Sequence, residues 1–316
     1  MSAGLDDHLA RVPDSQARRG LSLFCDGIKE VAAALKNSQV TSIGTSNHFG
    51  DEQLSVDVIA DKILFGKMGV SGVVRGAASE ELPELRDIHE EGSLVVAWDP
   101  LDGSSIVDCN WAVGTIAGFW KCGKNGMEWK GKDTLVGASG RQQVASVLAM
   151  YGPRTTLLLW AEGDEGVHEY TLHDQHWYLS NRICNIKEKG AKLFSPANLR
   201  AAQDLPPYKE LIDFWMTNRY TLRYTGGLVP DVYQMFIKGH GVFANPASAK
   251  APAKLRAVFE CAPIAMLVEA AGGKTSDGKQ SILDLKFNSM DHRTPFCAGS
   301  AEEVERFEKV MASGSQ

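Results

Sequence analysis

Residues 94–105, "LVVAWDPLDGSS", set a run of five apolar residues against two aspartates, a proline, a glycine and two serines. The apolar run predicts a buried strand, and Pro100 and Gly103 predict a tight turn directly after it. Asp99 and Asp102 therefore stand three positions apart at the end of a buried strand, where an uncompensated negative charge is costly. Because a nearby cation would remove that cost, this stretch indicates a metal site.

Acidic residues recur where three other apolar elements begin or end. They occur in "FGDEQLSVD" (49–57), "ASEE" (78–81) and "VFECAP" (258–263), as Asp51, Asp57, Glu80, Glu81 and Glu260. Each stretch also has an ordinary explanation that needs no metal. Asp51 and Glu260 could be acidic residues in the first turn of a helix, and Glu80 and Glu81 could be solvated charges in a loop. Together, carboxylates on separate elements suit a hard divalent cation such as Mg²⁺, which prefers oxygen ligands. The Leu101 carbonyl, inside the turn, is expected to face the same cavity.

The two serines after Gly103 extend this interpretation to phosphate chemistry. Ser104 and Ser105 resemble the start of a helix or turn, whose backbone N–H groups can hold a phosphate. A metal site next to a phosphate cradle indicates hydrolysis of a phosphoryl group.

Composition narrows the class of partner and the compartment. The 316 residues carry a formal net charge of −6, which argues against nucleic-acid binding, and no apolar run is long enough to span a membrane. The first residues do not resemble a targeting peptide, so we expect a cytoplasmic protein, with a plastid location after removal of a presequence as the alternative. The six cysteines are scattered without a C-x-x-C pair, which favours a reducing compartment over a zinc site or disulfide framework.

Strand and helix patterns alternate along the chain. Helical spacing predicts helices over residues 19–38, 50–68 and 260–273, and a capping box at Ser300 and Glu303 begins a last helix. Apolar runs predict strands over 70–81, 92–100, 111–120, 143–152, 155–163 and 166–174. This mixture predicts α/β or α+β layering. A polar stretch after residue 180 predicts an N-terminal α+β metal-binding lobe, 1–185, and a C-terminal α/β substrate-clamp lobe, 186–316.

Five motifs in order resemble one enzyme family. "DPLDGSS" is similar to the signature of the lithium-sensitive sugar and inositol phosphatases. With "FGDEQLSVD", "SEE", "KLRAVFE" and "APIAMLVEAAGG", the chain resembles the fructose-1,6-bisphosphatase class from about residue 49 to residue 273. Within that class it is most similar to the sedoheptulose bisphosphatases. The resemblance implies a five-layer α-β-α-β-α sandwich and a homodimer or homotetramer.

The resemblance also implies a role for each matching position. The ligands of Mg²⁺, or of Mn²⁺, would be Asp51, Glu80, Asp99, the Leu101 carbonyl, Asp102 and Glu260. Glu81 and Asp57, together with Glu80, would position and deprotonate the attacking water. The backbone of Gly103, Ser104 and Ser105, next to Asp102, would hold the phosphate that is removed.

A bisphosphate also needs a clamp for its other phosphate. Arginine suits bidentate phosphate recognition, and tyrosine adds a neutral donor, although a basic surface stretch is the ordinary alternative. The candidates lie in residues 194–200, 218–227 and 253–260 and at one further position: Asn198, Arg200, Arg219, Tyr220, Arg223, Tyr224, Lys254, Arg256 and Asn245. In relatives, the residue that matches Arg223 reaches the site of the neighbouring subunit.

Departures from the family refine the expected function. Asn245 stands where relatives specific for fructose bisphosphate carry tyrosine, which favours the seven-carbon sugar. Residues 39–54 lack the two regulatory cysteines of plastid relatives, and Ser93 and Leu94 replace a Lys-Tyr pair of the AMP site. We therefore expect a Mg²⁺-dependent hydrolase of the 1-phosphate of sedoheptulose 1,7-bisphosphate. The alternatives are fructose 1,6-bisphosphate hydrolysis, dual activity, or a catalytically idle sugar-phosphate sensor.

Overall fold

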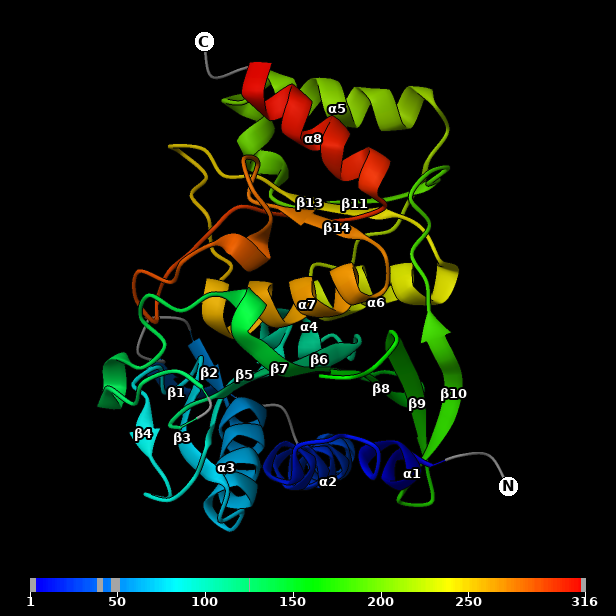
Figure 1. Cartoon of the computed structure of the whole chain (residues 1–316). Coiled ribbons are helices and arrows are strands. Elements are labelled where there is room, and N and C mark those ends of the chain that lie inside the picture. The colour runs from blue at the N-terminus through cyan, green and yellow to red at the C-terminus, as the bar shows by residue number, and fades with distance from the viewer. Residues whose placement is uncertain (1–3, 39–41, 47–51, 125, 314–316) are drawn as a thin grey trace.

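The computed structural model describes residues 4–38, 42–46, 52–124 and 126–313. Figure 1 shows five layers in which helices and sheets alternate: a helical layer, a large sheet, a middle helical layer, a second sheet and an outer helical layer. This is the α-β-α-β-α sandwich expected for the family, and that prediction is confirmed. Asp51 and most of the loop that precedes it lie outside the described residues.

The first helical layer packs its apolar face on the large sheet. It consists of α1 (Leu5–Leu9), α2 (Ser15–Asn37) and α3 (Ser55–Gly69). Leu21, Phe24 and Ile28 recur along one face of α2 at helical spacing and are fully buried. The helix predicted over 50–68 begins later than expected. Residues 52–54 form strand β2 (Glu52–Leu54), which pairs with β1 (Ser42–Ser46).

The large sheet has eight strands, and its centre carries the stretch that opened the sequence analysis. In spatial order the strands are β10 (His176–Cys184), β9 (Val167–His173), β8 (Thr155–Ala161), β7 (Gln143–Tyr151), β6 (Val113–Lys121), β5 (Leu94–Asp102), β3 (Val74–Ser79) and β4 (Arg86–Asp87). Strand β5 runs parallel to β3 and antiparallel to β6. All nine of its residues are buried, because helices cover both faces of the sheet.

The middle helices α6 (Leu228–Lys238) and α7 (Ala262–Ala270) separate the two sheets (Figure 1). The second sheet has the order β12 (Thr221–Leu222), β11 (Leu193–Pro196), β13 (Val242–Asn245), β15 (Phe296–Gly299) and β14 (Lys274–Ser276). Its outer face is covered by α5 (Pro206–Thr217) and α8 (Ala301–Ser313). One core joins Ile116 and Leu148 of the large sheet to Val229 of α6 and Ile264 of α7. The division at 185/186 stays a prediction.

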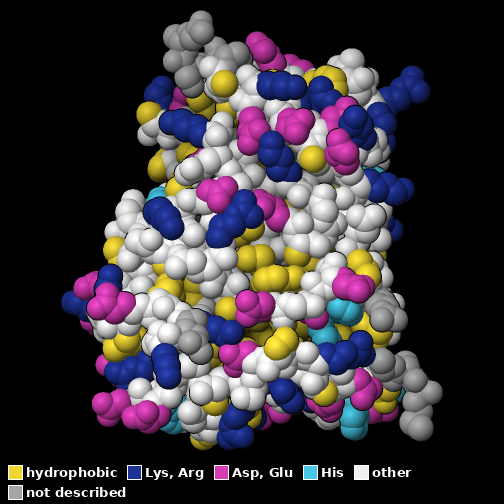
Figure 2. All heavy atoms as spheres, in the orientation of Figure 1, with side chains coloured by type: hydrophobic (Ala, Val, Ile, Leu, Met, Phe, Trp, Pro, Cys, Tyr) yellow, Lys and Arg dark blue, Asp and Glu magenta, His cyan; other side chains and the backbone are white. Residues whose placement is uncertain are grey.

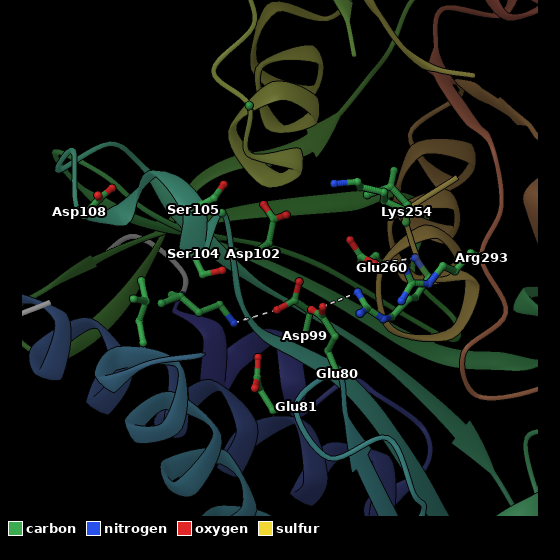
Figure 3. Close-up of a pocket in the computed structure, with 16 residues that line it drawn as sticks. Glu80, Glu81, Asp99, Asp102, Ser104, Ser105, Asp108, Lys254, Glu260 and Arg293 are labelled. Atoms are coloured by element: carbon green, nitrogen blue, oxygen red, sulfur yellow. Dashed lines mark hydrogen bonds and ion pairs between the residues drawn. The ribbon is translucent and has the colours of Figure 1, made fainter. Parts of the chain in front are cut away.

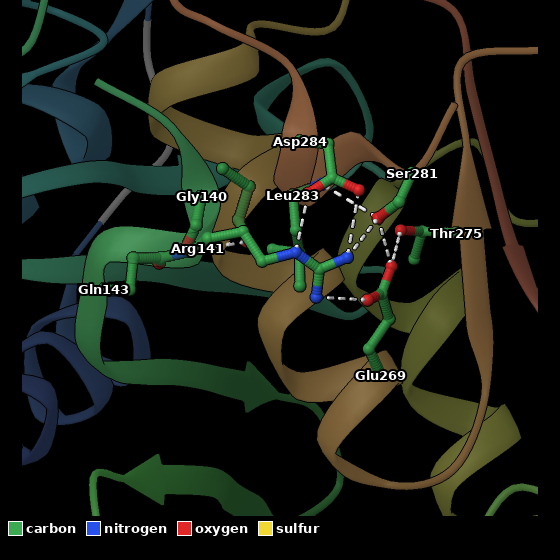
Figure 4. Close-up of polar contacts among 9 residues, drawn as sticks. Gly140, Arg141, Gln143, Glu269, Thr275, Ser281, Leu283 and Asp284 are labelled. Carbon is green, nitrogen blue, oxygen red and sulfur yellow. Dashed lines mark hydrogen bonds and ion pairs between the residues drawn. The ribbon is translucent and has the colours of Figure 1, made fainter. Parts of the chain in front are cut away.

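A polar network ties α7 to the segment that holds Arg141 and to residues 275–284 (Figure 4). The guanidinium of Arg141, in the short helix η2 (Gly140–Gln142), donates to Asp284 at 2.8 Å and to Glu269 of α7 at 3.1 Å. The other oxygen of Glu269 accepts from the hydroxyls of Thr275 and Ser281. The network therefore braces the helix whose first turn follows Glu260.

One predicted cap does not form as expected. Glu303 is fully buried, and its carboxylate accepts from the Trp215 indole at 2.7 Å and from the Tyr220 hydroxyl at 2.9 Å. It therefore serves the contact between α5 and α8 rather than a capping box with Ser300. Tyr220 points into this contact and not toward a phosphate clamp.

The surface is mixed in charge. Figure 2 shows acidic and basic side chains interspersed on the face that it presents. Across the described part of the chain, no helix is long and apolar enough to cross a membrane. All six cysteines are free thiols, and only Cys109 is exposed.

Candidate active site

The end of strand β5 forms the floor of the site. The Leu101 N–H donates to Asp99 Oδ1 at 2.9 Å, and the Thr115 hydroxyl donates to the Pro100 carbonyl at 2.8 Å. These bonds hold the turn, so that Asp99 and Asp102 stay buried, with only 3% and 8% of their surfaces exposed. The strand end is as buried as the sequence predicts.

A third carboxylate comes from a distant part of the chain. Glu260 belongs to a π-helical turn (Ala257–Cys261) that leads into α7, and it accepts from the Arg256 N–H at 2.6 Å. Ligand oxygens of Asp99, Asp102 and Glu260 lie within 4.8 Å of one another. Figure 3 shows the three side chains pointing into one cavity. Three buried carboxylates at this spacing are a candidate cation site.

Burial raises the pKa of each of these groups. The pKa values of Asp99 and Glu260 lie well above the ordinary range, because of burial first and repulsion by Glu80 second. Burial also raises the pKa of Asp102 to about 7, although two backbone N–H groups of α6 favour its ionised form. Those groups belong to Leu228 and Val229 and donate at 3.2 and 2.6 Å. The cluster cannot be fully ionised at low cost without a cation beside it.

Two glutamates follow β3 at the edge of the same cavity. Glu80 accepts a charge-assisted hydrogen bond from the buried guanidinium of Arg256. Glu81 is half-buried and lies near Asp57, the third residue of α3. Asp57 Oδ2 accepts from the Leu54 N–H at 2.9 Å, while its buried Oδ1 has no hydrogen-bond partner among the described residues. Burial, together with repulsion by Glu81 and Glu80, raises the pKa of Asp57 to about 7.

The turn after Asp102 shapes the mouth of the cavity. Gly103 has a φ of 90°, and it precedes the single-turn helix α4 (Ser104–Val107). A Cβ on Gly103 would lie 3.2 Å from Val113, so both the conformation and the space suit glycine. Ser104, Ser105 and the next polar residue, Asp108, line the cavity, which holds about 590 Å³.

Most of the predicted site residues come together in this cavity. Its lining includes eleven of them: Glu80, Glu81, Asp99, Leu101, Asp102, Gly103, Ser104, Ser105, Lys254, Arg256 and Glu260. The sequence did not single out Arg293, which lies on the same wall as Lys254 (Figure 3). An antiparallel bridge between Arg256 and Arg293 places it there, and no local pattern marks that pairing.

The remaining clamp candidates lie outside this lining. Arg200, Arg223 and Tyr224 are exposed. Burial of its hydroxyl raises the pKa of Tyr224, and the positive charge of Arg200 partly offsets that rise. Asn198 donates its amide protons to the Pro246 carbonyl at 2.8 Å and to the Ala251 carbonyl at 3.1 Å. It therefore holds together the two ends of the loop 246–251. Their role in binding stays a prediction.

Asn245 and Arg256 are two further clamp candidates, and their role in substrate binding also stays a prediction. Asn245 is half-buried at the end of β13, where it pairs with Phe296 of β15. Arg256 was predicted as a phosphate clamp, but its guanidinium is engaged by Glu80 and lies 3.7 Å from Asp291. It therefore contacts the carboxylates at the edge of the cation site.

Comparisons with known proteins identify the family of this chain. Residues 13–181 match the family model "Fructose-1-6-bisphosphatase, N-terminal domain", and residues 186–312 match the model of its C-terminal domain. The chloroplastic sedoheptulose-1,7-bisphosphatase of Triticum aestivum is 43% identical over 99% of this chain and 77% of its own length. A fructose-1,6-bisphosphatase class 1 from Syntrophotalea carbinolica is 39% identical over 94% of this chain and 90% of its own length.

Solved structures show the same fold over nearly the whole chain. A crystal structure from Toxoplasma gondii, described as that of a sedoheptulose-1,7 bisphosphatase, has a TM-score of 0.92 and 48% identity and covers 98% of this chain and 99% of its own. The holo form of Leishmania major fructose-1,6-bisphosphatase has a TM-score of 0.91 and 27% identity, with the same coverage.

Proposed function

Because this chain belongs to the fructose-1,6-bisphosphatase family, we propose that it is a phosphoric monoester hydrolase acting on sedoheptulose 1,7-bisphosphate. The reaction removes the 1-phosphate with water and yields sedoheptulose 7-phosphate and phosphate. The observation that carries this proposal is the buried triad Asp99, Asp102 and Glu260 at the end of β5, beside the Gly103–Ser105 turn.

The donor set fits a hard divalent cation. Three buried carboxylates repel one another, and all have raised pKa values, which favours the presence of positive charge. Oxygen ligands suit Mg²⁺, with Mn²⁺ as the alternative. We propose that the ligands of this cation are Asp51, Glu80, Asp99, the Leu101 carbonyl, Asp102 and Glu260. When bound, the ion neutralises this cluster and withdraws electron density from the phosphate.

The residues around the cluster supply binding and proton transfer. The N–H groups of Gly103, Ser104 and Ser105 hold the 1-phosphate, and Lys254 adds positive charge at the rim. Glu81 and Asp57 orient the attacking water and take its proton, while the phosphorus–oxygen bond to the sugar breaks and the leaving sugar oxygen gains a proton in turn. A pKa of about 7 suits Asp57 to this exchange near neutral pH. Arg256 keeps the Glu80 carboxylate in place through its charge-assisted hydrogen bond.

The far end of the substrate is proposed to reach the second sheet. Arg200, Arg223, Tyr224, Asn198 and Asn245 come from loops and strand ends of that sheet, and arginine suits the 7-phosphate. In a homodimer or homotetramer, Arg223 would serve the neighbouring subunit, which suits its exposure here. We further propose a cytoplasmic location.

Fructose 1,6-bisphosphate is the alternative substrate, since relatives named fructose-1,6-bisphosphatase class 1 are 39–40% identical to this chain. The two sugars must be distinguished by the part of the pocket that lies between the two phosphates of the substrate. There, Asn245 leaves more room than the tyrosine of relatives specific for fructose bisphosphate. A single polar contact is worth about 0.5–1.5 kcal/mol, or about twofold to tenfold in specificity. We therefore expect higher kcat/KM on the seven-carbon substrate, with residual activity on the shorter one.

The test compares phosphate release from both bisphosphates at equal Mg²⁺. Asn245→Tyr should shift the ratio of kcat/KM toward fructose 1,6-bisphosphate, and Ala249→Ser, at an exposed position of the loop that follows β13, serves as the control. Equal or higher efficiency of the unmodified protein on fructose 1,6-bisphosphate would promote the alternative. Absence of Mg²⁺-dependent phosphate release from either sugar would instead favour the idle sensor.

A further inference from the structure

A second cluster of metal-ligating side chains lies at the N-terminal helix. His8 belongs to α1, Asp164 to the turn between β8 and β9, and His168 to β9. One ligand atom from each lies within 4.8 Å of the other two. None of the three lines the acidic cavity. We propose that His8, Asp164 and His168 bind a borderline divalent ion such as Zn²⁺, at a site separate from the catalytic one.

Neighbouring groups hold two of these ligands in position. His8 Nε2 lies 2.8 Å from Asp164 Oδ1, and His8 Nδ1 lies 2.6 Å from the Tyr170 hydroxyl. The second oxygen of Asp164 accepts from the Ala161 N–H at 2.8 Å. His8 and Asp164 therefore each direct one atom toward the cluster while the other polar atom is fixed. This outer shell is the arrangement that orients histidine and carboxylate ligands at metal sites.

The third ligand lies against the first. The rings of His8 and His168 have centroids 4.3 Å apart and are tilted by 39°. Two imidazolium rings at this distance would repel each other, whereas two neutral rings can share one divalent ion. The ion would take the place of the proton between His8 and Asp164, which is released to solvent, and His8 would keep its remaining proton on Nδ1, facing the Tyr170 oxygen, which can accept it.

The ligand atoms must shift slightly to hold an ion. Tetrahedral zinc with bonds of about 2.0 Å brings its ligand atoms to about 3.3 Å from one another. His8 is buried, with 5% of its surface exposed, whereas His168 is only half-buried. His8 Nε2 and Asp164 Oδ1, which lie 2.8 Å apart, must therefore separate by about 0.5 Å, and rotation of the His168 ring can bring the third ligand atom toward them. Its partial exposure leaves a side on which water completes four ligands.

The donor atoms separate this site from the catalytic one. Two imidazole nitrogens and one carboxylate oxygen suit Zn²⁺ or Co²⁺, whereas the three carboxylates at β5 suit Mg²⁺. The bound ion would join a five-residue helix to the large sheet. Because so short a helix is unstable alone, such a tie would anchor the start of the chain.

Cobalt spectroscopy on the full chain tests the proposal. With Mg²⁺ in excess to occupy the carboxylate site, one equivalent of Co²⁺ should give the intense visible absorption of a tetrahedral complex. His8→Gln, Asp164→Asn and His168→Gln should each abolish that band. Tyr170→Phe should weaken Co²⁺ binding about 10- to 100-fold without removing it. His173→Gln and His176→Gln, at exposed histidines of β9 and β10, are matched controls that should keep the band.

A thermal melt gives an independent measurement. Zn²⁺ should raise the Tm of the unmodified protein and of both controls, but not that of the three ligand variants. His168→Gln keeps the test decisive if His8→Gln fails to fold, because His168 is half-buried. Circular dichroism and Mg²⁺-dependent turnover report whether each variant is folded. Absence of a tetrahedral band in the unmodified protein, or a band that survives His168→Gln in a folded variant, would overturn the proposal.

Discussion

At the scale of the residue, Asp102 connects two parts of the site. Its carboxylate belongs to the proposed cation site and accepts hydrogen bonds from two backbone N–H groups in the first turn of α6. We expect Asp102→Asn and Glu80→Gln to abolish turnover, because each removes a negative charge that the cation requires. In the absence of divalent ions, the Tm of Asp102→Asn should be unchanged or slightly higher, since repulsion within the cluster falls.

Glu81→Gln is the matched comparison for those variants. Glu81 is proposed to orient and deprotonate the attacking water, so its replacement should leave divalent-ion binding, measured by calorimetry, intact. The kcat should fall about 10²- to 10⁴-fold. Full activity of Asp102→Asn or Glu80→Gln at saturating substrate and modest Mg²⁺ would contradict the assigned site.

Asp61 predicts a pH dependence of stability. Burial raises its pKa to about 6, although the Trp98 indole donates to its Oδ1 at 3.0 Å. Between about pH 4 and pH 6 the folded protein holds a proton that the unfolded chain has released, so the free energy of unfolding falls as the pH rises. At pH 7 the loss reaches at most about 3 kcal/mol.

Asp61→Asn should therefore flatten the curve of unfolding free energy between about pH 4 and pH 6 and increase stability at pH 7, as measured by urea titrations. Asparagine keeps an oxygen for the Trp98 indole. Asp174→Asn, at an exposed turn, controls for the loss of one carboxylate. A parallel curve for Asp61→Asn and the unmodified protein would show that Asp61 does not titrate in this range.

Single residues differ in how well sequence predicts their place. Asp99 and Asp102 were predictable because an apolar run and a turn fix both their burial and their spacing. Arg293 was not, because it reaches the cavity through an isolated bridge with Arg256, and nothing local marks a pairing between residues 37 positions apart. Glu260 was a candidate from its place beside an apolar element, and the motif resemblance assigned it to the metal site.

At the scale of the element, β6 and α6 approach each other closely beside the site. A Cβ on Gly114 would lie 2.4 Å from both the Ala149 carbonyl and the Val229 side chain. Gly114→Ala should therefore push β6 away from α6, disturb the Val229 N–H that holds Asp102, and destabilise the fold by about 1–3 kcal/mol. Denaturation should show the loss, and kcat should fall with it.

Gly66→Ala is the control for this change. Gly66 lies inside α3, and a Cβ there meets no atom within 4 Å. The substitution should stabilise the protein by about 0.5–1 kcal/mol and leave kcat unchanged. Equal effects of the two glycine substitutions would contradict the proposed close contact.

Element boundaries followed the sequence where the pattern was long. The apolar spacing of α2 and the fully buried run of β5 were identified with few errors. The helix predicted from residue 50 failed at its start, because β2 is only three residues long and Asp57 caps the helix from within. At α8, Glu303 bonds to Trp215 of a helix 88 positions away, a contact that outweighs the local capping pattern.

At the scale of the whole molecule, the thiols predict indifference to redox state. Five of the six free cysteines are buried and one is exposed. Rates after incubation with oxidised and then with reduced dithiothreitol should therefore be similar. A large, reversible activation by thioredoxin would show that a pair among the six acts as a switch.

The layered architecture was predictable only through resemblance to a family. Composition and periodicity indicate mixed α/β layering, but they do not say that α6 and α7 lie between two sheets. That order depends on long-range pairings, such as the parallel contact of β11 with β13 and the antiparallel contact of β13 with β15. Their register is set by tertiary packing rather than by local pattern.

The position of β5 has a consequence for how activity is lost. It pairs on both sides, all nine of its residues are buried, and it ends in two of the site's carboxylates. Such a strand belongs to the part of a protein whose amide protons exchange last with solvent. The catalytic floor should therefore be among the last regions to open, so that heat or urea would abolish this half of the site only when the whole sheet dissolves.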